Sequence, residues 1–108
     1  MAYQPVIQSE QLDGLFQGVL QLKTLEDCYR FFEDLCTVHE MQDMGQRFEV
    51  ARQLRAEVTY HDIVERTGAS TATISRVNRC LNYGTGGYRL VLERLAAAQA
   101  GGDTSEET

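Results

Sequence analysis

This 108-residue chain has no long apolar run, no leader-like N-terminal segment and only three cysteines. No stretch comes near the roughly 18 consecutive apolar residues that span a bilayer, and no basic segment followed by an apolar run opens the sequence. We therefore expect neither membrane insertion nor secretion. The three cysteines cannot all pair within one chain, and Cys28, Cys36 and Cys80 each sit inside an apolar helical pattern, so we expect the reducing cytoplasm as the location.

The composition fits one compact folded domain, with 43% apolar and 24% charged residues. The net charge of −6 argues at first against a nucleic-acid partner, but the charge is unevenly spread. Residues 1–45 carry eight acidic and two basic side chains, whereas residues 46–100 carry five acidic side chains and eight arginines. The acidic segment 100–108 lacks large apolar side chains, so we expect a disordered tail there.

Helical periodicity runs through almost the whole chain, so we predict an all-α fold. Residues 1–8 form an N-terminal arm, and Ser9 can cap a first helix. Thr24, followed by Asp27, can cap a second helix. The expected apolar stripes of these helices are Leu12, Leu15, Phe16, Val19 and Leu22, and Leu25, Cys28, Tyr29, Phe32, Leu35 and Cys36. Cys36 and His39 have the spacing of metal ligands, but cysteines on a core stripe make a metal site the weaker interpretation.

Four more helices are expected between residues 37 and 99. Thr37 and Glu40 form a capping box that opens the third, which ends near Ala56. A short helix follows the cap residue Thr59 and stops at Gly68. Further helices are expected at 71–81 and 88–99. In the first of these, helical spacing puts Ile74, Val77 and Leu81 on one side, so that the other residues can point outward, namely Thr73, Ser75, Arg76 and Arg79. The glycine-rich segment between the two helices is a turn, or alternatively a flexible reader of the DNA backbone or of a partner.

The segment 59–81 has the pattern of a helix-turn-helix, with a short first helix, a tight turn at Gly68 and small residues where the second helix begins. Small hydroxyl residues allow a recognition helix to enter the major groove and to contact base edges, while arginines reach phosphates. The alternative is a plain helical hairpin with solvated hydroxyls. The predicted DNA-binding residues are His61, Ser70, Thr71, Ala72, Thr73, Ser75, Arg76 and Arg79.

The chain resembles the Trp repressor family, in particular its YerC/YecD-like branch, over about residues 9–95. The resemblance is carried by Met44–Arg47, Gly68–Ala69, Ala72–Arg76 and Leu81–Tyr88. It implies a six-helix, intertwined homodimer that presents two recognition helices to a two-fold operator. His61 stands where the repressor has an arginine that contacts DNA, so a different operator is expected.

The same resemblance implies an effector site in which Thr37, Arg47 and Arg76 match the positions that hold tryptophan in the repressor. Guanidinium groups suit this role because they stack on aromatic rings and pair with carboxylates. However, Val77 replaces a glycine beside the ring, and Cys80 replaces a serine. The smaller pocket should reject tryptophan, so we expect no cofactor. Both arginines would then contact phosphates or neighbouring acidic residues.

The sequence thus predicts a DNA-binding transcriptional regulator, most simply a repressor, whose folded domain covers residues 9–99. We expect no enzymatic activity, because the acidic side chains are scattered and do not converge with a base or nucleophile. The alternative function is a protein-interaction module that keeps the helix-turn-helix shape.

Overall fold

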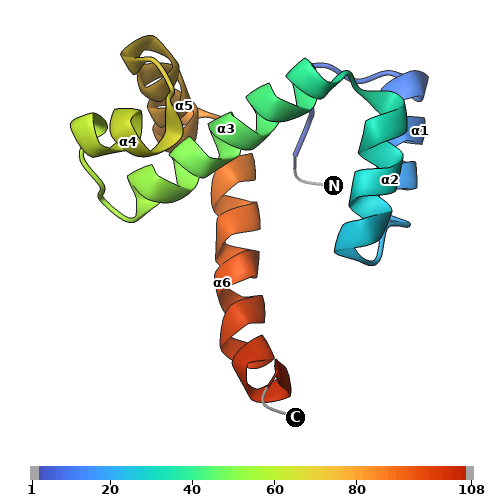
Figure 1. Cartoon of the computed structure of the whole chain (residues 1–108). Helices are drawn as coiled ribbons and strands as arrows, with labels where there is room; N and C mark the ends of the chain where they lie inside the picture. Colours follow the sequence, from blue (N-terminus) through green and yellow to red (C-terminus); the bar gives the residue numbers. More distant parts are fainter. Residues whose placement is uncertain (1–2, 107–108) are drawn as a thin grey trace. The chain divides into compact units, whose positions relative to one another are not determined.

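The computed structural model describes the backbone of residues 3–106 and the side chains up to residue 100, and this part of the chain forms six helices (Figure 1). Two units, divided after Met41, are described separately below. None of the described helices is long and apolar enough to cross a membrane. The helices are α1 (Glu10–Val19), α2 (Leu25–Leu35), α3 (Val38–Arg55), α4 (Tyr60–Thr67), α5 (Thr71–Tyr83) and α6 (Gly87–Glu106).

The N-terminal unit contains α1 and α2, whose predicted caps are confirmed. Ser9 Oγ accepts a hydrogen bond from the Leu12 N–H at 3.1 Å, and Thr24 Oγ1 accepts one from the Asp27 N–H at 3.0 Å. The expected extension of the first stripe to Leu22 is wrong, because the chain leaves the helix after Val19 through two successive turns. Cys36 likewise is not helical but has extended backbone at the C-cap of α2.

A capping box opens α3, as the sequence predicts. The Thr37 N–H donates to Glu40 Oε1 at 2.9 Å, and the Glu40 N–H donates to Thr37 Oγ1 at 3.1 Å. The hydrogen bond from the Thr37 N–H favours the charged carboxylate and lowers the pKa of Glu40. The helix ends at Arg55, next to the predicted position.

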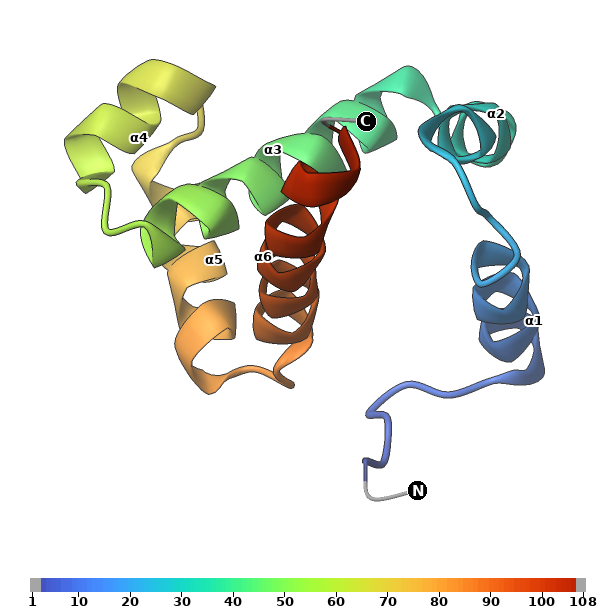
Figure 2. The ribbon, with the colours of Figure 1, turned by 90° about the horizontal axis from the view of Figure 1, so that it is seen from below.

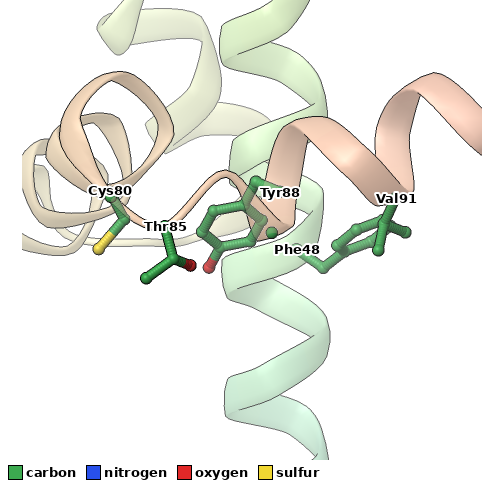
Figure 3. Close-up of a pocket in the computed structure, with 7 residues that line it drawn as sticks. Phe48, Cys80, Thr85, Tyr88 and Val91 are labelled. Carbon is green, nitrogen blue, oxygen red and sulfur yellow. The ribbon is translucent and has the colours of Figure 1, made fainter. Parts of the chain in front are cut away.

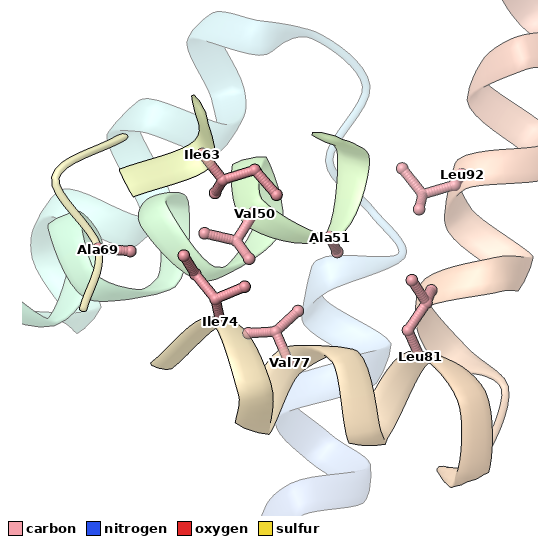
Figure 4. Close-up of a cluster of buried hydrophobic side chains, with 8 residues drawn as sticks. All are labelled: Val50, Ala51, Ile63, Ala69, Ile74, Val77, Leu81 and Leu92. Atoms are coloured by element: carbon pink, nitrogen blue, oxygen red, sulfur yellow. The ribbon is translucent and has the colours of Figure 1, made fainter. Parts of the chain in front are cut away.

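The hydrophobic core lies in the C-terminal unit, where α5 packs against both α4 and α6 (Figure 2). The side chains of Val50, Ile63 and Ile74 are completely buried, and each contributes about 1.5–3 kcal/mol through removal from water. They come from α3, α4 and α5, so these three helices share one core. Its full membership is Val50, Ala51, Ile63, Ala69, Ile74, Val77, Leu81 and Leu92 (Figure 4).

Helix α5 is two residues longer than predicted and ends at Tyr83. Gly84 and Gly86 then turn the chain into α6, which begins one residue earlier than expected, at Gly87. Gly86 has a φ of +89°, a conformation that favours glycine. The expected end of α6 at residue 99 is wrong, because this helix continues to Glu106 and so runs through most of the segment 100–108 that was expected to be a disordered tail. Residues 107 and 108 lie outside the described backbone.

The turn generates a prediction for Gly84→Ala. A Cβ atom at Gly84 would overlap the carbonyl oxygen of Cys80, a backbone atom that cannot move aside without disturbing α5. We expect Gly84→Ala to lower the free energy of unfolding by about 1–3 kcal/mol, measured by denaturant titration followed by circular dichroism. Gly87→Ala is the control, because its Cβ would meet only Thr85 Oγ1 at 3.8 Å. Equal stability of the two variants would contradict the proposed geometry of the turn.

Candidate nucleic-acid interface

The segment predicted as a helix-turn-helix folds as one, formed by α4, a short turn and α5. Gly68 ends α4 with a φ of +74°, a left-handed conformation that an alanine would adopt only with strain. Ala69, 2% exposed, packs into the core. Ile63 of α4 and Ile74 of α5 bury their side chains in the same cluster, so the two helices are locked together.

Side-chain hydrogen bonds also hold the turn. Gln46 of α3 donates through Nε2 to the carbonyl oxygen of Thr67 at 3.2 Å. The Thr67 hydroxyl donates to the Ile63 carbonyl at 2.7 Å and accepts from the Ala69 N–H at 3.1 Å. The backbone that leads into α5 is therefore fixed by α3 and α4, which sets the direction of the recognition helix. Sequence patterns did not single out Gln46 or Thr67 for this role.

The start of α5 is capped by Ser70, which alters the role expected of Ser70 and Thr73. Ser70 Oγ accepts from the Thr73 N–H at 3.1 Å and lies 3.1 Å from Thr73 Oγ1. Both hydroxyls are therefore engaged with each other, and Thr73 is half-buried. The expectation that Thr73 points freely outward is not met, because its position in the first turn brings it back onto the cap.

The remaining residues that were predicted to contact DNA are all exposed to solvent. Ile74, Val77 and Leu81 turn one face of α5 into the core, which leaves the opposite face free. The first turn of α5 contains no acidic residue that would repel a phosphate. The exposed predicted residues are His61 on α4 and Thr71, Ala72, Ser75, Arg76 and Arg79 on α5.

Some arginines of the C-terminal unit are paired with carboxylates and others are not. Arg52 and Arg55 form ion pairs, with Glu49 at 3.0 Å and Glu93 at 3.8 Å. The bond from Arg52 lowers the pKa of Glu49. By contrast, Arg76 and Arg79 have no carboxylate partner within the described part of the chain, and their charge is available to an external anion.

Arg66, in the last turn of α4, is also exposed and has no ion-pair partner among the described residues. No sequence pattern had indicated this residue. Its place beside the turn of the helix-turn-helix is the signal that could have revealed it, because it lies only four residues before the cap residue Ser70.

The residues matched to an effector site fall in both units. Thr37 belongs to the N-terminal unit, and its hydroxyl is engaged in the capping box. Arg47 and Arg76 belong to the C-terminal unit, and both are exposed. Val77 is only 2% exposed because its side chain fills the core between the helices. This isopropyl group, at the position where the resemblance implies a glycine, therefore has a packing role in the core.

An open apolar depression of about 560 Å³ lies beside the end of α5 (Figure 3). It is lined by Phe48 of α3, Cys80 of α5, and Tyr88 and Val91 of α6, together with the turn. Cys80 was expected within an apolar helical pattern, but the structure leaves it exposed. Among the described residues, no three side chains of the metal-ligating types cluster together.

Comparisons with known proteins agree with this architecture. The family described as Trp repressor protein matches residues 10–96. The uncharacterised protein YerC of Bacillus subtilis (strain 168) is 58% identical over 89 residues, which cover 82% of this chain and 86% of YerC.

Two crystal structures are also similar. A TrpR-like protein from Eubacterium eligens ATCC 27750 has a TM-score of 0.80 and 57% identity, over 82% of this chain and 92% of that one. A candidate Trp repressor from Staphylococcus aureus has a TM-score of 0.79 and 46% identity, over 82% and 89%. The chain therefore belongs to the Trp repressor family, within its YerC-like branch.

Proposed function

We propose that the protein is a sequence-specific DNA-binding transcriptional regulator, acting as a repressor on a two-fold operator. The observation that carries the proposal is the division of α5 into two faces. One face is buried in the core, and the other presents small side chains together with two unpaired arginines, Arg76 and Arg79. A helix of this kind can enter the major groove with its N-terminal end.

The contacts divide by chemistry. Thr71, Ala72 and Ser75 are short enough to let the helix backbone approach the bases, where hydroxyls form hydrogen bonds and methyl groups contact thymine. Arg76 and Arg79 contact phosphates and thereby fix the orientation of the helix. His61 adds a contact from α4, whereas Ser70 and Thr73 act by shaping the helix N-terminus.

We also propose that the working unit is a homodimer. The N-terminal unit has no buried residue in α1 or α2, so these helices lack a core of their own. Exposed apolar surface of this extent is typical of an interface, and a second copy satisfies the two-fold symmetry of an operator. The half-sites would then lie about 34–36 Å apart. The exposed apolar residues involved are Phe16, Leu20, Leu25, Tyr29, Leu35 and Val38.

Tryptophan is not required for DNA binding in this proposal. Arg47 and Arg76 are available for a carboxylate, but Val77 occupies the space that a glycine would leave beside an indole ring. A pocket reduced by one isopropyl group discriminates against so large a ligand by steric exclusion. We therefore propose that the regulator binds its operator without a cofactor.

The decisive experiment is selection of duplexes from a random DNA pool by the purified protein, at two salt concentrations and with or without tryptophan. Recovery of one palindromic motif in every condition supports the proposal. Enrichment only with tryptophan would contradict the role given to Val77. No enrichment would favour the alternative, a protein-interaction module. Neutralised phosphates make affinity fall steeply with salt, whereas an apolar protein interface is much less sensitive.

Two substitutions on α5 test the division of contacts. Arg79→Ala should weaken binding to the selected and a scrambled duplex by the same factor and reduce the slope of log affinity against log salt by about 1. Ser75→Ala should weaken only the selected duplex, by about 1–3 kcal/mol, with the slope unchanged. Fluorescence anisotropy titrations measure both effects. Identical behaviour of the two variants on both duplexes would be incompatible with the assignment.

The dimer is tested at Phe16, which is 56% exposed on α1. Burial of a phenylalanine side chain contributes about 1.5–3 kcal/mol, which corresponds to about 10- to 100-fold in a dissociation constant. We therefore expect Phe16→Glu to weaken dimerisation by at least tenfold in sedimentation equilibrium. Gln17→Glu introduces the same charge at the neighbouring exposed position and is the control. A wild-type protein that sediments as a monomer would exclude the dimer.

A further inference from the structure

The last residue of the recognition helix, Tyr83, is exposed to an unusual degree. Its side chain is 87% accessible, far more than that of Tyr88 across the turn. A large aromatic side chain on the surface of a small domain loses apolar contact with the core and is favoured where one end meets a polar partner. No hydrogen bond of its phenol group occurs among the described residues.

The position of Tyr83 on α5 puts its exposed side chain on the same face as the proposed DNA-contacting residues. Residues four or seven apart on a helix lie on the same face. Tyr83 follows Arg79 by four residues and Arg76 by seven, and Arg76 follows Ala72 by four. Tyr83 therefore lies on the same face of α5 as Ala72 and both arginines that have no carboxylate partner among the described residues. The core face, with Ile74, Val77 and Leu81, lies elsewhere around the helix.

The turn that follows α5 keeps Tyr83 helical and therefore on this face. The Gly84 N–H donates to the Cys80 carbonyl at 2.9 Å, which completes the last turn of α5 around Tyr83. Because a Cβ atom at Gly84 would overlap the same carbonyl oxygen, only glycine allows this close approach. Tyr83 is consequently helical even though it is the final residue of α5.

We propose that Tyr83 donates a hydrogen bond from its phenol group to a phosphate at the edge of the major groove. Tyr83 lies eleven positions after Ala72, which at about 1.5 Å per residue is about 16.5 Å along the helix axis. The major groove is only about 12 Å wide, so a helix with Ala72 at the bases carries Tyr83 beyond the base edges to the sugar-phosphate backbone. This assignment rests on the proposed function.

A neutral phosphate contact has a signature that separates it from the contacts of the arginines. Tyr83→Phe removes only the hydroxyl and should weaken binding to the selected and the scrambled duplex by the same factor, about tenfold. Because no charge is lost, the salt dependence of affinity should stay as in the wild type, unlike that of Arg79→Ala. Tyr88→Phe makes the same chemical change across the turn and should bind both duplexes like the wild type.

The other outcomes overturn the assignment. Wild-type affinity of Tyr83→Phe for both duplexes would remove Tyr83 from the interface, and a loss confined to the selected duplex would indicate a base contact. A loss of dimer mass in sedimentation equilibrium would place Tyr83 between two copies of the chain. These results leave the proposed function standing, whereas failure of the wild type to bind either duplex would exclude the proposed function together with this contact.

A second measurement uses the unaltered protein. Tetranitromethane modifies accessible tyrosines, and peptide mass spectrometry reports the extent of nitration at each. We expect the selected and the scrambled duplex both to protect Tyr83, with the protection lost at high salt, because the phosphate contact is independent of sequence. Unchanged nitration of Tyr83 in a sample shown to be DNA-bound would overturn the proposal.

Discussion

The packing of Val50 between Ile63 and Ile74 is the interaction on which the candidate interface depends (Figure 4). These side chains come from α3, α4 and α5, and all three are fully buried. Protein interiors are close-packed, so the helices cannot slide past one another without opening a void. The exposed face of α5 is consequently presented in one orientation, which a reader of base edges requires.

The same core underlies the proposal that operator binding needs no effector. In the effector site that the resemblance implies, a glycine leaves space beside the indole ring, whereas the side chain of Val77 joins α5 to the cluster with Ala51 and Leu81. An isopropyl group placed there stabilises the unliganded arrangement. Because Val77 is used for packing and leaves no space for a ligand there, the structure is consistent with the proposal that the regulator binds DNA without a small molecule.

Stability is distributed unevenly along the chain. The C-terminal unit has a core, a hydrogen-bonded turn and ion pairs, whereas α1 and α2 have well-formed caps but no buried side chain. Caps contribute only about 1 kcal/mol each and cannot replace a core. The N-terminal unit therefore depends on further apolar contacts for its stability, and a second copy of the chain is the partner that the proposed operator symmetry favours.

The helix caps and the buried face of α5 follow from the sequence alone, because short-range interactions determine them. The caps at Ser9, Thr24 and Thr59, the capping box and the stop at Gly68 were predicted correctly, because each depends on residues within one turn of helix. Periodicity likewise identified Ile74, Val77 and Leu81 as the buried face of α5.

Only the tertiary structure decided the rest, because solvent access and pairing depend on residues distant in sequence. Tertiary packing leaves Cys80 exposed beside Phe48 and Tyr88, and it leaves Arg76 and Arg79 without a carboxylate partner among the described residues. The pairing of Arg55 with Glu93 joins residues of α3 and α6, which no local pattern relates. Sequence periodicity defines the faces of a helix, but packing alone determines what covers each of them.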